Sequence, residues 1–247
     1  MQPEIKNHPR IVALNSVSEA GFPGVVCPVI FLPGCNFKCP YCMNSKAVLN
    51  PHTLPSKYTA EEVLEYLKDN GETNLLISGG EPCLHSNLPD LVQFFVDNGV
   101  KVRLSTNGSY PTTLKELLDK QLITFVAMDL KTAVGVDDLG AVSDDVETAN
   151  NILRSITLLD TALGDGRTDF SVEYRTTLYP EIVGRAAIKE ISDLIHPDAT
   201  WVLQQFRVAK NMLNPDAYDV KPFSDEEVNS LLEVARVQHP NTHVRWP

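Results

Sequence analysis

The sequence predicts an α/β fold in which six β-then-α units form an incomplete, TIM-like (β/α)6 barrel that is open on one side. Short apolar runs alternate along the chain with segments of helical period. Most of these runs are continuously apolar, as expected for a parallel sheet buried on both faces. The 247 residues, 43% of them hydrophobic, suffice for one large domain, but six units are too few to close the usual barrel of about eight.

The predicted strands are six apolar runs that are separated by polar and turn-forming residues. Right-handed crossovers are expected to wind them into a parallel barrel or an open part of one. They cover Val25–Leu32, Asn74–Ser78, Val100–Ser105, Ile123–Leu130, Phe170–Thr176 and Thr200–Phe206.

A helix is predicted after each strand. Two helices begin with a capping box, in which Thr59 is followed by Glu62 and Ser224 by Glu227. A further helix has an early proline and a closing glycine. The six predicted helices cover Thr59 to Gly71, Pro89 to Asn98, Pro111–Lys120, Asp145–Thr161, Val183–His196 and Ser224–Gln238.

Composition and charge limit the function classes. The net charge is −11 and no Lys/Arg cluster occurs, so nucleic acid is not expected as a partner. No apolar run approaches the length of a membrane span and no export signal opens the chain, so we expect a cytoplasmic protein without a membrane partner. No linker divides the sequence, which predicts a single domain over 1–247 with its core at about 20–240.

Two segments are longer and more polar than tight barrel connections. Val134–Asp145 is rich in aspartate, and Val208–Phe223 is rich in Pro, Asn and Asp. Both are expected to be solvated surface, or surface on which a partner docks.

The most specific motif is Cys35-Asn-Phe-Lys-Cys39-Pro-Tyr-Cys42, which places three thiols on one short segment. A [4Fe–4S] cube has four irons that are usually bound by thiolates. Three thiolates therefore leave one iron open to a substrate or cofactor. The other two cysteines, Cys27 and Cys83, are too few for a second cluster and are expected to be small buried residues.

A zinc site and a disulfide are the alternatives for this motif. Zinc needs a fourth ligand, and the candidates His8, His52 and His85 do not stand at a typical finger spacing from the cysteines. Five cysteines is an odd number, which disfavours a disulfide framework. The spacing favours an iron–sulfur cluster, with zinc as the second interpretation.

Polar groups recur where the predicted strands end. In a parallel barrel those ends meet at one rim, where functional loops lie. The groups are the cysteine segment, Gly79-Gly80-Glu81-Pro82, Ser105-Thr106-Asn107-Gly108, Asp129 with Lys131, Glu173 with Arg175, and Gln204-Gln205-Phe206-Arg207. A polar, charged ligand is therefore expected at this rim.

The cysteine motif, with an aromatic before its last cysteine, followed by Gly-Gly-Glu-Pro resembles the radical S-adenosylmethionine (SAM) enzymes. Ser105-Thr-Asn-Gly108, Ala127-Met-Asp-Leu-Lys131, Tyr174-Arg-Thr-Thr177 and Leu203-Gln-Gln-Phe206 are similar to the activating proteins of glycyl radical enzymes. Among these, the activators of anaerobic ribonucleoside-triphosphate reductase are the most similar. The resemblance implies a laterally open radical SAM barrel.

The resemblance also implies roles for residues. Cys35, Cys39 and Cys42 would hold the cluster, whose open iron would bind SAM. Gly79 and Gly80 would let the backbone approach the methionine part of SAM, the alternative being an ordinary strand-to-helix turn. Glu81 and Pro82 are further implied cofactor contacts, and Glu81 would either orient the backbone or meet the ammonium group of SAM. Tyr41 would either pack beside the adenine of SAM or shield the cluster from water.

The remaining implied SAM contacts lie on the middle and later strands. Thr106 and Asn107 would touch the methionine or ribose part, or serve only in a turn. Asp129 and Lys131 would balance the ammonium and carboxylate of SAM, or form a structural ion pair. Arg175 and Arg207 would bind a carboxylate or close ion pairs, while Ser105 stands where many activases carry an acidic residue that could bind a cation.

The implied reaction is reductive cleavage of SAM to a 5′-deoxyadenosyl radical, which removes a hydrogen atom from glycine in a partner enzyme. An external electron donor such as flavodoxin or ferredoxin would reduce the cluster, under anaerobic conditions. Two alternatives stay open: a radical SAM enzyme acting on a small molecule such as a purine-like precursor of a modified base, and a zinc-stabilised binding module without catalysis.

Overall fold

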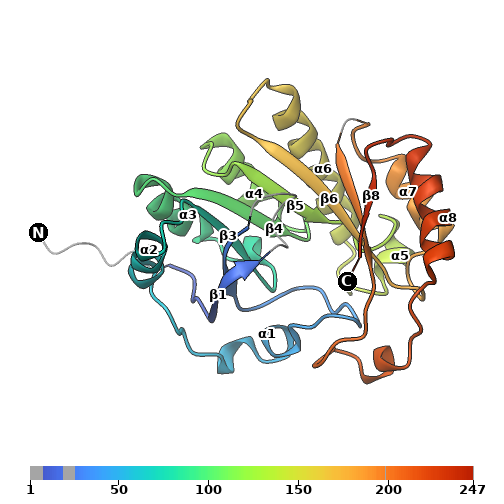
Figure 1. Cartoon of the computed structure of the whole chain (residues 1–247), viewed down its shortest axis with the longest axis horizontal. Coiled ribbons are helices and arrows are strands. Elements are labelled where there is room, and N and C mark those ends of the chain that lie inside the picture. The colour runs from blue at the N-terminus through green and yellow to red at the C-terminus, as the bar shows by residue number, and fades with distance from the viewer. Residues whose placement is uncertain (1–7, 19–25, 198, 247) are drawn as a thin grey trace, which may run out of the picture.

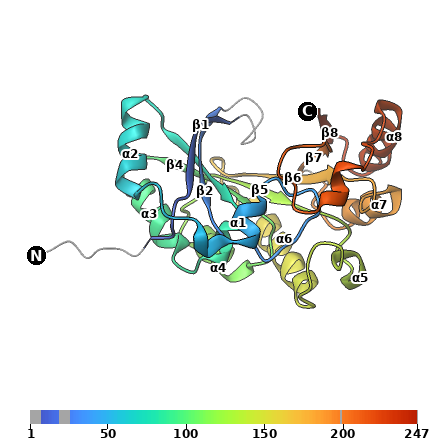
Figure 2. The same cartoon turned by 90° about the horizontal axis from the view of Figure 1, so that it is seen from below.

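The computed structural model describes residues 8–18, 26–197 and 199–246, without the side chains of Val136 and Asp137. One eight-stranded sheet, with its strands in chain order, forms the centre of the molecule. β1 (Ala13–Ser18) pairs antiparallel with β2 (Cys27–Leu32), and every later pair is parallel. The sheet is arched, and its edge strands β1 and β8 (His243–Arg245) stand apart, so that the barrel is open between them (Figures 1 and 2).

All six predicted strands are confirmed. Val25, at the start of the first, lies outside the described residues, as do residues 20–24 of the predicted core. The five after β2 are β3 (Asn74–Gly79), β4 (Lys101–Thr106), β5 (Phe125–Asp129), β6 (Ser171–Leu178) and β7 (Thr200–Gln205).

All six predicted helices are confirmed and cover the outer face of the sheet (Figure 2). Both capping boxes are present, with Thr59 and Ser224 each accepting from the backbone N–H three residues later. The helices are α2 (Ala60–Asp69), α3 (Leu88–Asp97), α4 (Pro111–Asp119), α6 (Thr148–Gly164), α7 (Arg185–Ser192) and α8 (Asp225–Arg236). Among the described residues, no helix is long and apolar enough to cross a membrane.

Apart from short 3-10 helices, four of the described elements were not predicted. They are the two edge strands β1 and β8, and two short helices, α1 (Ser45–Leu49) and α5 (Val136–Leu139). β1 mixes apolar residues with Asn15, Ser16 and Ser18, and β8 has only three residues, so neither forms a recognisable apolar run.

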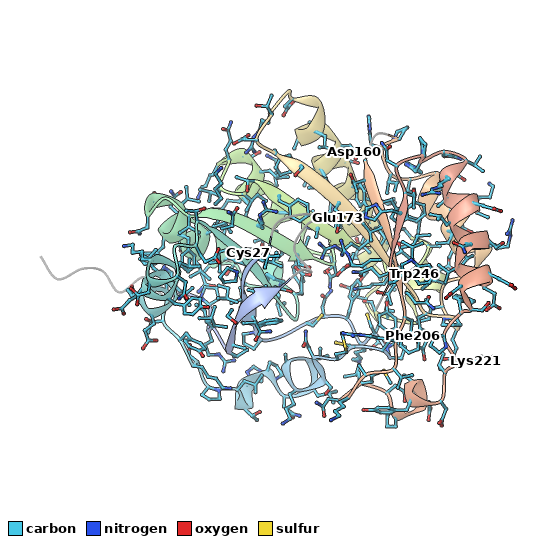
Figure 3. The ribbon with its side chains drawn as sticks, viewed as in Figure 1. Cys27, Asp160, Glu173, Phe206, Lys221 and Trp246 are labelled. Carbon is cyan, nitrogen blue, oxygen red and sulfur yellow. The ribbon has the colours of Figure 1, made fainter. Side chains whose placement is uncertain are left out.

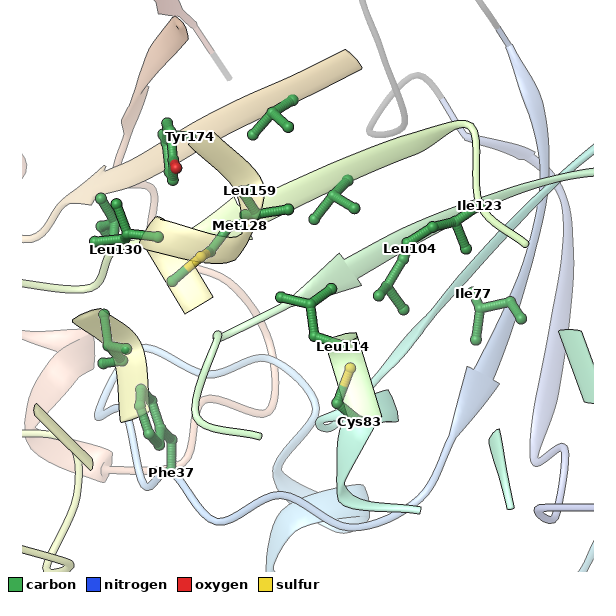
Figure 4. Packing of buried hydrophobic residues seen from close by; sticks show 14 of the residues in the cluster. Phe37, Ile77, Cys83, Leu104, Leu114, Ile123, Met128, Leu130, Leu159 and Tyr174 are labelled. Atoms are coloured by element: carbon green, nitrogen blue, oxygen red, sulfur yellow. The ribbon is translucent and has the colours of Figure 1, made fainter. Parts of the chain in front are cut away.

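Cys27 and Cys83 are both buried, as predicted. Cys83 packs in the main core with Leu114 and Ile77 (Figure 4). Cys27 packs with Val29 and Leu76 in a smaller cluster.

Candidate active site

A cavity of about 620 Å³ lies at the carboxyl ends of the parallel strands, which is the rim predicted from the sequence. Its volume falls in the usual range for small-molecule sites. All but two of the predicted site residues line it: Cys35, Cys39, Tyr41, Cys42, Gly79, Gly80, Ser105, Thr106, Asn107, Asp129, Lys131, Arg175 and Arg207.

The three motif cysteines lie on the loop after β2, which we call the cysteine loop (residues 33–44). The backbone N–H of Phe37 donates to Cys35 Sγ at 3.3 Å, and that of Cys42 donates to the Cys39 carbonyl at 3.0 Å. Burial raises the pKa of Cys35 to about 12 and that of Cys39 to about 11. A metal must therefore displace thiol protons when it binds.

The two long polar loops hold the cysteine loop from two sides. The backbone N–H of Lys38 donates to the Val142 carbonyl at 2.7 Å, and that of Asn214 donates to the Pro40 carbonyl at 3.0 Å. Val142 is buried, and Asp144 pairs with Lys38. Many residues of both loops are exposed, as expected, but each loop also has buried residues and bonds to the cysteine loop, so it supports the cysteines as well.

The cysteine loop fits an iron–sulfur cluster. All three thiols line one cavity, and the side-chain amide of Asn107 lies 3.9 Å from Cys35 Sγ, where it can donate to the sulfur. Hydrogen bonds to cluster sulfurs are one means by which proteins tune the cluster. Among the described residues, no group of three His, Cys, Asp or Glu side chains is placed to bind one metal ion such as zinc. An iron–sulfur cube does not need such a group, because each of its thiolates binds a separate iron.

The wider cavity fits SAM, which carries both charges and an aromatic base. Cationic and anionic side chains lie on the same wall, and two buried oxygens, Tyr41 Oη and Gln205 Oε1, have no hydrogen-bond partner among the described residues. Buried polar atoms are normally satisfied, so these atoms are candidates to meet a ligand.

Gly79 and Gly80 are required by contacts with the cysteine loop and the strand before it. A Cβ on Gly79, whose φ is +131°, would lie 2.2 Å from the Leu32 carbonyl oxygen. A Cβ on Gly80 would lie 1.9 Å from the Gly34 carbonyl oxygen. The glycines thus let β3 pass close to the backbone that leads into the three motif cysteines, which is a physical reason different from the predicted approach to SAM.

Glu81 and Pro82 are the two predicted residues that do not line the cavity. The carboxylate of Glu81 is buried and accepts hydrogen bonds from the Cys83 N–H at 2.8 Å, the Thr106 hydroxyl at 2.7 Å and the Asn107 N–H at 2.6 Å. Burial raises the pKa of Glu81 to about 7, against the effect of these donors. Two backbone N–H groups and the Thr106 hydroxyl occupy the oxygens of Glu81. This favours the role of orienting the backbone over contact with an ammonium group.

Thr106 and Asn107 have turn contacts and also line the cavity. The Thr106 hydroxyl accepts from the Gly108 N–H, and Asn107 Oδ1 accepts from the Ser109 N–H at 3.0 Å. The amide nitrogen of Asn107 also donates to Asn36 Oδ1 in the cysteine loop at 3.1 Å. These hydrogen bonds connect the end of β4 to the cysteine loop.

Asp129 and Lys131 form an ion pair of 3.0 Å that borders the cavity. Burial lowers the pKa of Lys131, but the charges of Asp129, Tyr41 and Cys39 together raise it above its ordinary value. Lys131 is therefore a cation at neutral pH, placed 17% exposed beside the cofactor space.

Lys131→Ala is expected to raise the Kd for SAM at least about tenfold, equal to about 1.4 kcal/mol, because a charge on the cofactor loses its counterion in a poorly solvated site. Equilibrium binding of SAM to the reconstituted protein measures this. Lys101→Ala is the matched control, because it removes an exposed lysine that begins β4 and does not line the cavity. Equal affinity of the two variants would assign Lys131 to structure alone.

Arg245 and Trp246, which lie at β8, are cavity residues that were not predicted. Arg175 and Arg245 both pair with Glu173, which is fully buried in β6. Arg245 and Trp246 line the cavity at the end of β8. Figure 3 labels Glu173, in β6, and Trp246, which directly follows β8. Glu173 was expected at the rim with Arg175, but it is buried within β6 and does not line the cavity. The brevity of β8 hid Arg245 and Trp246.

Tyr41 belongs to an aromatic cluster beneath the cysteine loop. Its ring centroid lies 5.0 Å from that of Tyr179, which in turn lies 4.9 Å from that of Phe206. Tyr41 is 8% exposed and borders the cavity. The cluster attaches the cysteine loop to the end of β7, so that Tyr41 has a packing role whether or not it also touches adenine.

Comparison with known proteins gives relatives over most of the chain. The chain is 30% identical over 232 residues, 92% of its length and 90% of the relative's, to a Methanocaldococcus jannaschii protein with the provisional name glycyl-radical enzyme activating enzyme. It is 25% identical to 7-carboxy-7-deazaguanine synthase of Clostridium acetobutylicum, over 84% of this chain and 95% of that enzyme.

Solved structures share the fold at low identity. Streptococcus suis SuiB bound to S-adenosylmethionine matches with a TM-score of 0.59 and 16% identity, over 89% of this chain and 51% of that one. TYW1 with a lysine-pyruvate adduct matches with a TM-score of 0.56 and 15% identity, over 86% of this chain and 73% of that one. The family model of the radical SAM superfamily matches residues 29–183, which include the cysteine loop and four of the parallel strands that follow. The chain belongs to the radical SAM superfamily, whose enzymes use a [4Fe–4S] cluster and S-adenosylmethionine.

Proposed function

We propose that this protein is an activase that installs a glycyl radical on a partner enzyme. The observation that carries the proposal is the 30% identity, over nearly the whole of both chains, to the Methanocaldococcus jannaschii protein named for this activity. The open side of the barrel supports it, because a segment of a folded partner needs lateral access to the cavity.

Cys35, Cys39 and Cys42 would hold the cluster, and the opposite wall would hold SAM. When bound, the cluster and SAM supply a 5′-deoxyadenosyl radical by one-electron reduction. Lys131 and Asp129 orient the charged end of the cofactor, and Asn107 donates toward Cys35. The chain's part in the reaction is to bind, orient and exclude water.

The finer assignment follows from the sequence motifs. Their resemblance to activators of anaerobic ribonucleoside-triphosphate reductase supports that reductase as the partner. A one-electron donor such as flavodoxin or ferredoxin would reduce the cluster. Transfer of a hydrogen atom from the glycine α-carbon leaves the glycyl radical, 5′-deoxyadenosine and methionine.

The test is electron paramagnetic resonance of an anaerobic ribonucleotide reductase after incubation with reconstituted, reduced protein and SAM. The proposal predicts a glycyl doublet on the reductase, and no doublet when the glycine of its radical site is replaced by alanine. SAM cleavage without a doublet on this or another glycyl radical enzyme would refute the activase.

A radical SAM enzyme acting on a small molecule is the second candidate. It is supported by the similarity to 7-carboxy-7-deazaguanine synthase over 84% of this chain. The cavity of about 620 Å³ is of a size that holds small molecules. Turnover of a purine-like substrate, without radical transfer to protein, would favour this candidate.

A further inference from the structure

One cation at the edge of the cavity has an unsatisfied donor. Arg245 ends β8, pairs in register with Gln204 of β7, and lines the cavity. Its Nη2 lies 3.3 and 3.4 Å from the two carboxylate oxygens of Glu173. Its Nη1 is buried and has no hydrogen-bond partner within the described part of the chain. Such a donor is unfavourable unless a ligand supplies an acceptor.

The charge of the cavity indicates the class of that acceptor. Two carboxylates oppose the cations among the described residues: Asp129 pairs with Lys131, and Glu173 is shared by Arg175 and Arg245. The cations that line the cavity therefore outnumber these two carboxylates. The four cationic side chains of the described lining are Lys131, Arg175, Arg207 and Arg245.

We propose that Arg245 is a substrate-binding residue that recognises a carboxylate on the molecule from which the hydrogen atom is taken. With Nη2 held by Glu173, Nη1 is left to donate a charge-assisted hydrogen bond to a carboxylate. Glu173, fully buried, holds one nitrogen of Arg245 and thereby fixes the direction of the other. Trp246, 46% exposed, lies next in the chain and adds a flat apolar surface to the same cavity.

This inference rests on the proposed function in assuming hydrogen-atom removal at this cavity. The carboxylate has two possible sources. One is an acidic side chain close to the target glycine of a partner protein. The other is a small organic acid, for which the compound named in the similar enzyme, 7-carboxy-7-deazaguanine, is a suitable probe.

The test compares two pairs of probes on protein that holds its cluster and SAM. The first pair is a blocked peptide with glutamate beside glycine and the same peptide with glutamine. The second is 7-carboxy-7-deazaguanine and 7-deazaguanine. We expect the carboxylate member of one pair to bind at least about tenfold more tightly, about 1.4 kcal/mol, than its neutral counterpart. Arg245→Gln should abolish that difference, and Arg154→Gln, on the exposed side of α6, should retain it.

Arg245→Lys keeps the positive charge without the fork, and should retain part of the preference. It also serves if Arg245→Gln fails to fold, as judged by iron content and thermal unfolding. The proposal is overturned if neither pair is discriminated, or if Arg245→Gln and Arg245→Lys both discriminate as well as the unsubstituted protein. The proposal is also overturned if Arg245→Gln raises the Kd for SAM by the same factor as the Kd for the carboxylate probe. Arg245 would then bind the cofactor.

The proposed activase can fail independently of this inference. If Arg245 discriminates 7-carboxy-7-deazaguanine and no glycyl radical forms on a partner, the activase is refuted and the role of Arg245 stands. If the glycyl radical forms but the protein binds both members of each probe pair equally, the activase stands and the role of Arg245 is refuted.

Discussion

Cys39→Ala is expected to abolish the iron–sulfur cluster and, with it, the cleavage of SAM. Cys39 is one of three cysteines that line the cavity, and the two other cysteines, Cys27 and Cys83, are buried and do not line it. Anaerobic reconstitution should give about four irons per chain for the unsubstituted protein and almost none for the variant. Iron and sulfide analysis together with the visible absorption spectrum measure this.

Cys27→Ala and Cys83→Ala are the matched controls for that experiment. Each removes one buried thiol and should cost about 1 kcal/mol of stability, because a small cavity is left, while the cluster remains. Stoichiometric zinc in place of iron, or full iron content in Cys39→Ala, would contradict the assignment of the ligands.

Gly80→Ala is expected to disrupt the site almost as severely. The added Cβ would lie 1.9 Å from the Gly34 carbonyl oxygen and 3.2 Å from Cys35 Cβ, so that the backbone next to a cluster ligand must move. We expect a loss of about 3 kcal/mol or more in the free energy of unfolding, at the upper end for overpacked sites, and a low cluster content. Denaturant unfolding under anaerobic conditions and iron analysis report the two effects.

Gly164→Ala is the control for this substitution. Gly164 ends α6, and a Cβ there meets no atom within 4 Å. Alanine is the better helix former, so stability should stay the same or rise by up to about 1 kcal/mol. If Gly80→Ala behaved like Gly164→Ala, the close approach of β3 to the cysteine loop would not constrain residue 80.

Local patterns in the sequence were sufficient for the barrel units. The continuous apolar runs gave the parallel strands, and the Thr59–Glu62 and Ser224–Glu227 boxes fixed two helix starts. Because the carboxyl ends of parallel strands share one rim, residues as distant as Cys35 and Arg175 could be placed in one site.

The rest depends on contacts between distant segments, which spacing does not reveal. The position of Glu81 away from the cavity results from donors at the end of β4, namely Thr106 and Asn107. Each polar loop holds the cysteine loop through a backbone hydrogen bond, at Lys38 or Pro40, and the first loop adds the exposed Lys38–Asp144 ion pair. Backbone bonds of this kind leave no signature in residue types.

The proposed role is tested most directly by following the hydrogen atom that the reaction removes. A glycyl radical partner enzyme made with glycine deuterated at the α-carbon is incubated with the reduced, reconstituted protein and SAM. The account predicts one deuterium in the 5′-deoxyadenosine, together with the glycyl doublet on the partner. The account would be contradicted if the 5′-deoxyadenosine contained no deuterium from the partner enzyme, while a deuterated small molecule did transfer its deuterium to 5′-deoxyadenosine.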